Sequence, residues 1–152
     1  MISLQDTFAP KNKCFGCGPA NQEGLQIKSF LEHDYLVANF SPKTHHQAFE
    51  NILSGGICGT LLDCHSNWCA AYFIMQHNKS LELPATVTAN FTVELLMPTP
   101  MDQVLIIKAW PKQISHNKAL IEANITANNQ ITANFKGLFI SVKEGHPAYN
   151  RW

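Results

Sequence analysis

The chain has 152 residues, a length typical of one domain with a single hydrophobic core. Eleven Lys and Arg residues balance eleven Asp and Glu residues, and this net charge of zero removes the main driving force for binding nucleic acid or an anionic membrane. Charged residues make up only 14% of the chain, which favours a compact domain that self-associates. We therefore expect one domain over residues 1–152 and no nucleic-acid or membrane partner.

The start of the chain and its cysteines bear on the cellular compartment. No apolar run reaches the roughly 18 residues that span a bilayer, and residues 1–10 lack the basic start and apolar centre of a signal peptide. The five cysteines are an odd number, which in a chain without an export signal favours free thiols. We expect a cytoplasmic protein.

The first third of the chain predicts a loop followed by a hairpin. Residues 8–24, FAPKNKCFGCGPANQEG, are dense in Gly, Pro and Asn, which is typical of an ordered but irregular loop. Residues 25–31 and 35–41 each alternate apolar with polar side chains, and the short segment 32–34 joins them as a turn. No regular pattern follows over residues 42–53.

The remainder predicts one helix and four strands. Residues 55–76 are long enough for five or six helical turns, and their apolar side chains fall on nearly every side, so this helix should be buried all round. Four strand-like segments separated by turn residues follow, at 85–97, 103–112, 118–127 and 131–143. The tail at 144–152 is expected to be loosely held. This order of elements predicts an α+β fold in which an antiparallel sheet of five to six strands wraps one long helix.

A polar stripe crosses the apolar helix. Gly56, Thr60, Asp63 and Asn67 follow one another at steps of four, three and four, which places them on one helix face. A carboxylate there is costly to desolvate, and the helix contains no basic residue that could neutralise it. Asp63 is either a buried acid satisfied by hydroxyls or backbone N–H groups, or a nucleophile or general base whose pKa burial raises.

The start of the helix offers backbone donors. Ser54 is a typical N-cap residue, and Gly55 and Gly56 allow a ligand to approach the first-turn N–H groups, where the helix dipole favours negative charge. Two interpretations are open, an oxyanion site and a simple loop that ends in a helix cap.

The cysteines form only half of a metal-ligand set. Cys14 and Cys17 make the single C-x-x-C motif, so a zinc site would need a ligand from Cys58, Cys64, Cys69 or a distant His. We predict no metal and no cofactor. The three helix cysteines have no nearby cation to lower their thiol pKa, and we interpret them as core filling.

Three segments resemble hotdog-fold acyl-CoA thioesterases of the PaaI-like, thioesterase superfamily member type. HHQAFENILSGGICGTLLDCHSNW resembles their helix-start signature, a His-Gly-Gly followed seven residues after its second Gly by an acid, here Asp63. TVTANFTVELLMPTP resembles the strand that follows, and CFGCGPANQEGLQIKSF resembles the opening of many members. The resemblance covers residues 14 to about 143 and implies the hotdog fold, hydrolysis of an acyl thioester, and an active unit no smaller than a dimer.

Thioester hydrolysis would assign catalytic roles to three residues. Asp63 would attack the thioester carbonyl or deprotonate water, two options that the sequence leaves open. The Thr88 hydroxyl would hold the carboxylate or the water, although Thr is also common in strands for packing reasons. A backbone N–H of Gly55, or of Gly56 as a substrate contact, would donate to the oxyanion.

Four further residues are candidate substrate contacts. Ser54 stands where the resemblance implies a His that supports the helix start. Relatives place an Asn or Gln just upstream, and its counterpart here must come from His46-Gln47-Ala48, with Gln47 the preferred candidate. Asn67, one turn beyond Asp63, is a weaker candidate partner of the acid.

Two other functions are compatible with the same residues. A hydratase or dehydratase of acyl thioesters would pair a His with an acid across the site, for which His45 and His46 are candidates. A sensor would bind acyl-CoA without converting it, because a fold alone does not fix a function.

Helix geometry predicts the assembly. Gly55 and Asp63 are eight residues apart, so at about 1.5 Å per residue they are separated by about 12 Å along the helix, too far to act on one thioester. Two copies related by a twofold axis can bring Gly55 of one chain to Asp63 of the other. We therefore predict a homodimer, or a dimer of dimers, with two shared sites per dimer.

Overall fold

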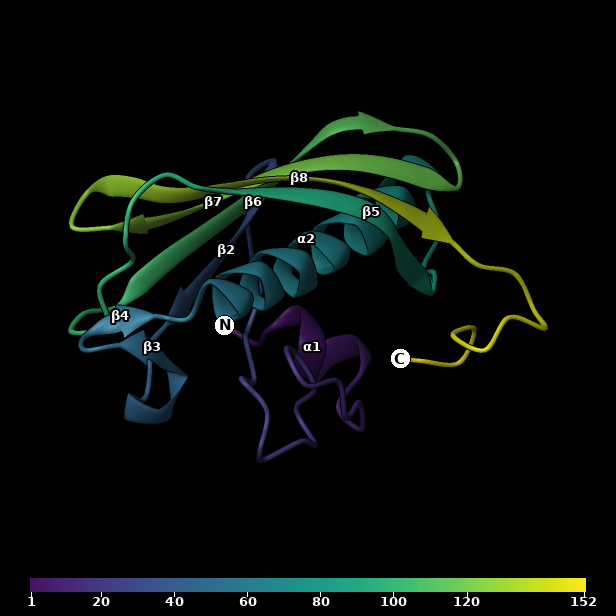
Figure 1. Cartoon of the computed structure of the whole chain (residues 1–152). Helices are drawn as coiled ribbons and strands as arrows, with labels where there is room; N and C mark the ends of the chain where they lie inside the picture. Colours follow the sequence, from purple (N-terminus) through teal and green to yellow (C-terminus); the bar gives the residue numbers. More distant parts are fainter.

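The computed structural model describes residues 1–152, and its main feature is one long helix that lies against one face of an antiparallel sheet (Figure 1). The elements in chain order are α1 (Leu4–Phe8), β1 (Phe30–Glu32), β2 (Tyr35–Phe40), the 3-10 helix η1 (Thr44–His46), β3 (Gln47–Phe49), β4 (Ile52–Leu53), α2 (Gly55–His77), β5 (Thr86–Leu95), β6 (Leu105–Ile114), β7 (Lys118–Ala127) and β8 (Gln130–Ser141). The predicted α+β arrangement of a sheet around one helix is confirmed.

The sheet has six strands in the order β1-β2-β6-β7-β8-β5, and β3 with β4 forms a separate small hairpin. Every neighbouring pair is antiparallel. The β7–β8 hairpin turns through Asn128 and Asn129, both with positive φ (48° and 61°), which is the conformation that matches the twist of paired strands. β5 forms one edge of the sheet and is the strand nearest to the viewer in Figure 1.

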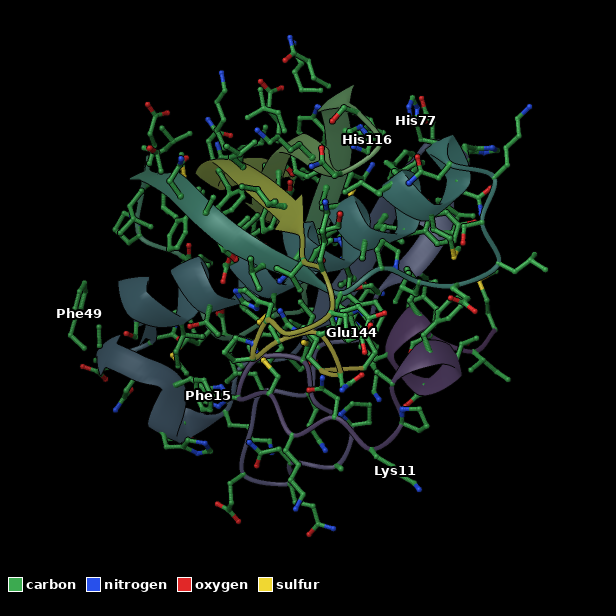
Figure 2. The ribbon with its side chains drawn as sticks, turned by 90° about the vertical axis from the view of Figure 1, so that its right-hand side faces the viewer. Lys11, Phe15, Phe49, His77, His116 and Glu144 are labelled. Atoms are coloured by element: carbon green, nitrogen blue, oxygen red, sulfur yellow. The ribbon has the colours of Figure 1, made fainter.

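Helix α2 is apolar on all sides because it is covered from two directions. The sheet covers one side, while α1 and the loop after it lie under the other side (Figure 1). Leu61, Leu62, Trp68 and Ile74 are fully buried as a result. At the end of α2, His77 lies near His116 of the β6–β7 turn (Figure 2), and Asn78 Nδ2 donates to the His116 carbonyl (2.8 Å).

The first predicted strand is wrong over most of its length. Only Phe30–Glu32 pairs in the sheet, whereas residues 25–29 run against the N-terminal loop. Leu25 N donates to Phe15 O (2.8 Å) and Ile27 N to Gly16 O (3.0 Å). Leu25 and Ile27 are both buried, so the alternation reflects burial in the core rather than pairing in the sheet.

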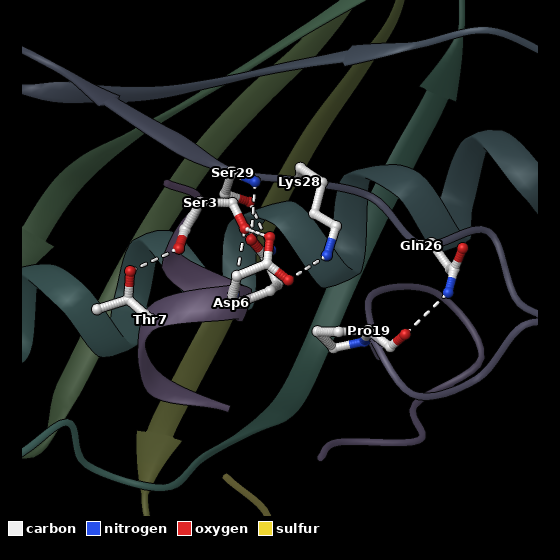
Figure 3. Close-up of polar contacts among 8 residues, drawn as sticks. Ser3, Asp6, Thr7, Pro19, Gln26, Lys28 and Ser29 are labelled. Atoms are coloured by element: carbon white, nitrogen blue, oxygen red, sulfur yellow. Dashed lines mark hydrogen bonds and ion pairs between the residues drawn. The ribbon is translucent and has the colours of Figure 1, made fainter. Parts of the chain in front are cut away.

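Helix α1 was not predicted, because its five residues are too few for a periodic pattern. Ser3 caps it by accepting from Asp6 N (3.1 Å), and Asp6 forms an ion pair with Lys28 Nζ (2.6 Å) (Figure 3). Gln5 Nε2 donates to Ser29 Oγ (2.9 Å), and Ser29 Oγ in turn contacts His65 Nδ1 of α2 (2.8 Å). These contacts attach the N-terminal segment to the underside of α2.

The C-terminal tail is better anchored than expected. Residues 144–147 are exposed, and Figure 2 views the molecule from the side of this tail, at Glu144. The final residue, however, packs its indole on Trp68 (ring centroids 4.4 Å apart), and Trp152 Nε1 donates to Pro84 O (2.8 Å). The expectation of a loose tail fails here because the partners of Trp152 lie far away in the sequence.

Candidate functional site

A groove of about 370 Å³ runs between the first half of α2 and strand β5. Its lining comes from two segments: Gly55, Gly56, Gly59, Thr60 and Asp63 on the helix, and Phe91, Val93 and Leu95 on the strand. The helix residues lie one turn apart, and the strand residues alternate along β5, so each set shares one face. Three predicted site residues, Gly55, Gly56 and Asp63, therefore line the same groove.

The groove stays open because two of its helix residues are glycines without neighbours. A Cβ on Gly59 would have no atom within 4 Å, and one on Gly56 would meet only Ser54 Oγ, at 3.7 Å. Gly55 is more enclosed, since a Cβ there would lie 2.9 Å from Leu95 Cδ1. Larger side chains at Gly56 or Gly59 would thus occupy space that a ligand could fill.

Asp63 is the one charged group in the groove, and Thr88 holds it. Thr88 Oγ1 donates to Asp63 Oδ1 (2.7 Å), while Oδ2 accepts no hydrogen bond. Burial raises the pKa of Asp63; the Thr88 hydrogen bond and the positive charge of Arg151 act in the opposite direction, and a negative charge at Cys14 acts with burial. The result is a carboxylate of increased basicity with one oxygen positioned and the other free to act on a ligand.

A bulge in β5 brings Thr88 and the apolar strand residues to the same face. The pairing of β5 with β8 shifts between Thr88 and Asn90, where one extra residue is inserted. Without this shift, Thr88 and Phe91 would point to opposite faces of the strand. The bulge therefore lets β5 present both the hydroxyl that holds Asp63 and the apolar wall of the groove.

The start of α2 presents unused backbone donors. Ser54 is the N-cap residue as predicted, but its side chain makes no capping hydrogen bond, and its carbonyl accepts from Ile57 N and Cys58 N (both 3.0 Å). The N–H groups of Gly55 and Gly56 have no acceptor. Together with the helix dipole, they favour an anionic or oxyanionic ligand atom at this end of the groove.

His46 and Gln47 do not line the groove of their own chain. The His46 side chain is buried against Phe40 (ring centroids 5.6 Å apart) and its Nδ1 accepts from Lys43 N (3.0 Å). Burial lowers the pKa of His46. Gln47 is exposed on β3, and the His46 carbonyl accepts from Ser54 N (2.9 Å), so this segment fixes where α2 begins.

Asn67 forms its hydrogen bonds with Thr86 of β5 and not with Asp63. Thr86 Oγ1 donates to Asn67 Oδ1 (2.5 Å), two residues before Thr88 on the same strand. Arg151 Nη1 donates to the Thr86 carbonyl (2.7 Å) and so holds the guanidinium of the C-terminal tail in place. The positive charge of this guanidinium lowers the pKa of Asp63. Asn67 and Arg151 thus position the strand that carries Thr88.

Sequence reasoning missed part of the site. Gly59 lies four residues before Asp63 and could have been found by extending the helix stripe. Phe91, Val93 and Leu95 were hidden by the bulge, which reverses the expected face of the strand. Arg151 comes from the tail, and no pattern in the sequence links it to the site.

No family model and no curated protein matches the sequence. Solved structures do match its fold. A thioesterase superfamily protein of Shewanella loihica is 25% identical, with a TM-score of 0.67, over 82% of this chain and 98% of that one. The PaaI protein of E. coli, from the phenylacetic acid degradation operon, is 15% identical, with a TM-score of 0.66, over 78% of this chain and 81% of that one. A phenylacetic acid degradation-related protein of Ralstonia eutropha is 16% identical, with a TM-score of 0.64, over 82% and 92% of the two chains.

Proposed function

We propose that this chain hydrolyses an acyl thioester, in the first instance an acyl-CoA, to the free acid and the thiol. It has the hotdog fold of thioesterase superfamily proteins, as the sequence motifs predicted. The observation that carries this proposal is the Asp63–Thr88 pair, an acid of raised pKa held by one oxygen and set in a groove with apolar walls.

The groove suits an acyl chain beside a reactive carbonyl. Phe91, Val93 and Leu95 offer an apolar wall for the acyl group, and Asp63 lines the same groove with Oδ2 free of hydrogen bonds. As general base, Asp63 takes a proton from water while the water oxygen attacks the carbonyl carbon; the tetrahedral intermediate then collapses and expels the thiolate, which takes up a proton. As nucleophile, Asp63 attacks the carbonyl carbon itself, and the C–S bond breaks to expel the thiolate, which takes up a proton. Water then hydrolyses the resulting anhydride to the free acid and restores the Asp63 carboxylate.

The site needs a second copy of the chain. Gly55 and Asp63 lie at the two ends of the groove, about 12 Å apart along α2, so one chain cannot place the carboxylate and the helix-start donors on one carbonyl. β5 is an edge strand that carries exposed apolar side chains. Phe91 and Leu95 of β5 are 48% and 56% exposed, and Leu96, which follows the strand, is 52% exposed. Such an edge favours a partner surface, and we propose a homodimer, or a dimer of dimers, built across β5.

The helix start of the second copy would complete the site. It would bring the Gly55 and Gly56 N–H groups as oxyanion donors, and the exposed Gln47, which lies on the strand paired with β4 immediately before Ser54, would contact the thioester or the water. Ser54 anchors this segment through its backbone N–H. His46 is a poor partner for acid–base chemistry, because its ring is buried and its Nδ1 already accepts a backbone hydrogen bond, which argues against His46 as the histidine of a hydratase.

Release of free thiol from a panel of acyl-CoA substrates, from acetyl to palmitoyl with an aryl member, tests the proposal directly. We expect turnover of at least one substrate and its loss in Asp63→Asn, whereas Asp34→Asn, which changes an exposed acid of the β1–β2 turn, should leave turnover intact. Binding without thiol release would support a sensor, and a change at the enoyl thioester absorbance would support a hydratase. Either result would contradict hydrolysis.

A further inference from the structure

A cluster of three thiols joins the N-terminal loop to α2 beside the groove, and none of the three lines the groove. Cys14 Sγ and Cys64 Sγ are 3.8 Å apart, and the sulfur atoms of Cys14, Cys17 and Cys64 all lie within 4.8 Å of one another. All five cysteines are free thiols. Cys64 is part of the core, as expected, and its sulfur also meets the C-x-x-C pair, which makes it the third ligand among the candidates that the sequence left open.

The loop is built to bring its backbone close to this cluster. A Cβ on Gly16 would overlap Cys64 Sγ, and one on Gly18 would overlap the backbone of Cys14, so both positions accept only glycine without rearrangement. Gly18 N donates to Cys14 O (2.9 Å) and closes the turn around the two loop cysteines. The segment Cys14-Phe15-Gly16-Cys17-Gly18 thus holds two sulfurs on one side of a tight turn.

Polar hydrogens surround the sulfur atoms. The thiols of Cys17 and Cys64, and to a smaller extent the N–H groups of Cys17 and Gly16, stabilise negative charge on Cys14 and lower its pKa below that of a free thiol. The indole N–H of Trp68 is buried without a hydrogen-bond partner, and its proximity to Cys17 favours the thiolate form of that residue. Donors of this kind typically surround metal-bound thiolates.

The spacing of the sulfurs matches a tetrahedral metal. Zn²⁺ binds thiolate at about 2.3 Å, so two ligands at a tetrahedral angle lie about 3.8 Å apart, the separation already present between Cys14 and Cys64. We propose that Cys14, Cys17 and Cys64 bind one Zn²⁺ ion per chain. No fourth His, Cys, Asp or Glu joins the cluster, so water or a small thiol takes the fourth position.

Zinc binding would fasten the loop to the helix beside the site. Cys14 binds as the thiolate, while Cys17 and Cys64, whose thiol pKa values are raised, release their protons to solvent as they bind. Because Cys64 follows Asp63 directly, the ion would hold α2 and the N-terminal loop together next to the catalytic acid. The ion's role in this proposal is to stabilise the fold, so it is independent of the reaction.

The test uses the full chain, reduced and stripped of metal, and titrated with Zn²⁺ against a chromophoric chelator and with Co²⁺ in a parallel series. We expect one ion per chain, thiolate-to-cobalt charge-transfer absorption, and a rise in Tm with Zn²⁺. Cys14→Ser and Cys64→Ser should each weaken binding by at least about 100-fold, since each removes a ligand. Cys69→Ala, which changes a buried cysteine of the same helix outside the cluster, should bind as wild type does.

Alkylation of the wild-type chain keeps the proposal testable where a variant does not fold. Zn²⁺ should protect Cys14, the least buried of the five cysteines, which a thiol reagent should otherwise modify first. Absence of stoichiometric Zn²⁺ binding under reducing conditions, or equal binding by Cys14→Ser, would overturn the proposal. A Cys14–Cys64 disulfide that forms in air while the reduced protein ignores Zn²⁺ would replace it with a redox site.

Discussion

Two titratable residues within one turn of α2, Asp63 and His65, differ in how burial leaves their hydrogen-bonding groups. His65 is fully buried, and both of its ring nitrogens have partners: Nδ1 contacts Ser29 Oγ (2.8 Å), and Nε2 contacts the Leu36 carbonyl (3.1 Å). Burial lowers the pKa of His65 to about 4, so it is a neutral ring that serves packing. Asp63 has one partner, Thr88, and an open groove on its other side.

One helix thus carries a polar residue with a structural role, His65, and a polar residue with a proposed chemical role, Asp63. A buried polar group whose hydrogen bonds are all made has nothing left to offer a ligand, as at His65. A half-buried acid with one free oxygen retains both basicity and access, as at Asp63. Substitution of His65 should therefore change the stability of the fold, whereas substitution of Asp63 should change thioester turnover.

The largest effect is expected for Asp63→Asn. It keeps the shape of the side chain and removes the base or nucleophile, so thioester turnover should fall by at least about 10²-fold. The Tm at neutral pH should not fall, because a costly buried charge is removed. Kinetics and thermal melts measured on the same preparation check both parts, and full activity in a folded Asp63→Asn variant would exclude this residue from the reaction.

His65→Leu should show the opposite result. The substitution removes the imidazole contacts of Ser29 Oγ and of the Leu36 carbonyl, leaving Ser29 Oγ only its hydrogen bond from Gln5, and should lower the free energy of unfolding by about 2 kcal/mol. The kcat per folded molecule should stay near that of wild type. His77→Leu, an exposed histidine of the same helix, is the matched control and should leave stability nearly unchanged in denaturant titrations.

Thr88→Ala should lower kcat about 10-fold and shift the pH profile. Removal of its hydrogen bond takes away an interaction that lowers the Asp63 pKa, so the acid limb of the rate profile should move to higher pH. A change in KM alone, with an unmoved acid limb, would make Thr88 a substrate contact instead. Thr92→Ala, on the opposite face of β5, is the control.

The two residues should also give opposite pH dependences of stability. The Asp63 pKa is raised above 3.8, so the acid contributes stability below that pH and loses it as pH rises through the folded pKa. The His65 pKa falls from 6.5 to about 4, so neutral His65 contributes above pH 6.5 and loses that contribution as the pH falls toward 4. Denaturant titrations from pH 4 to 8 check both parts. In His65→Leu, the free energy of unfolding should no longer show the decrease on acidification that His65 causes. In Asp63→Asn, the free energy of unfolding should increase relative to that of wild type as the pH rises.

The smallest effect is expected for Arg151→Gln. Arg151 lowers the Asp63 pKa through its charge without a direct contact, so its loss should move the acid limb to higher pH by less than Thr88→Ala does. Both shifts are read from the same rate profiles. An equal or larger shift for Arg151→Gln would mean that the tail is a closer partner of the acid than Thr88.

The sequence was informative where a pattern is local and uninformative where partners are distant. The α2 helix and five of the strands (β2, β5, β6, β7 and β8) follow from periodicity, and Asp63 stood out because an acid in an apolar helix needs a reason. The bulge after Thr88 is one inserted residue and leaves no compositional trace, so the wall at Phe91 was missed. Trp152 and Cys64 find their partners only through the tertiary fold.

The central claim is that Asp63 and the helix start act together in one thioester-hydrolysing site shared by two chains, and a complementation experiment tests it most directly. Gly55→Pro removes one donor at the first helical position, where proline is tolerated, and the extended backbone of Ser54 suits a following proline. This variant and Asp63→Asn, each inactive alone, are refolded together. A shared site predicts recovery of about a quarter of wild-type activity, because half of the dimers are mixed and each has one intact site of two. Well-folded mixed dimers without recovered activity would contradict the claim.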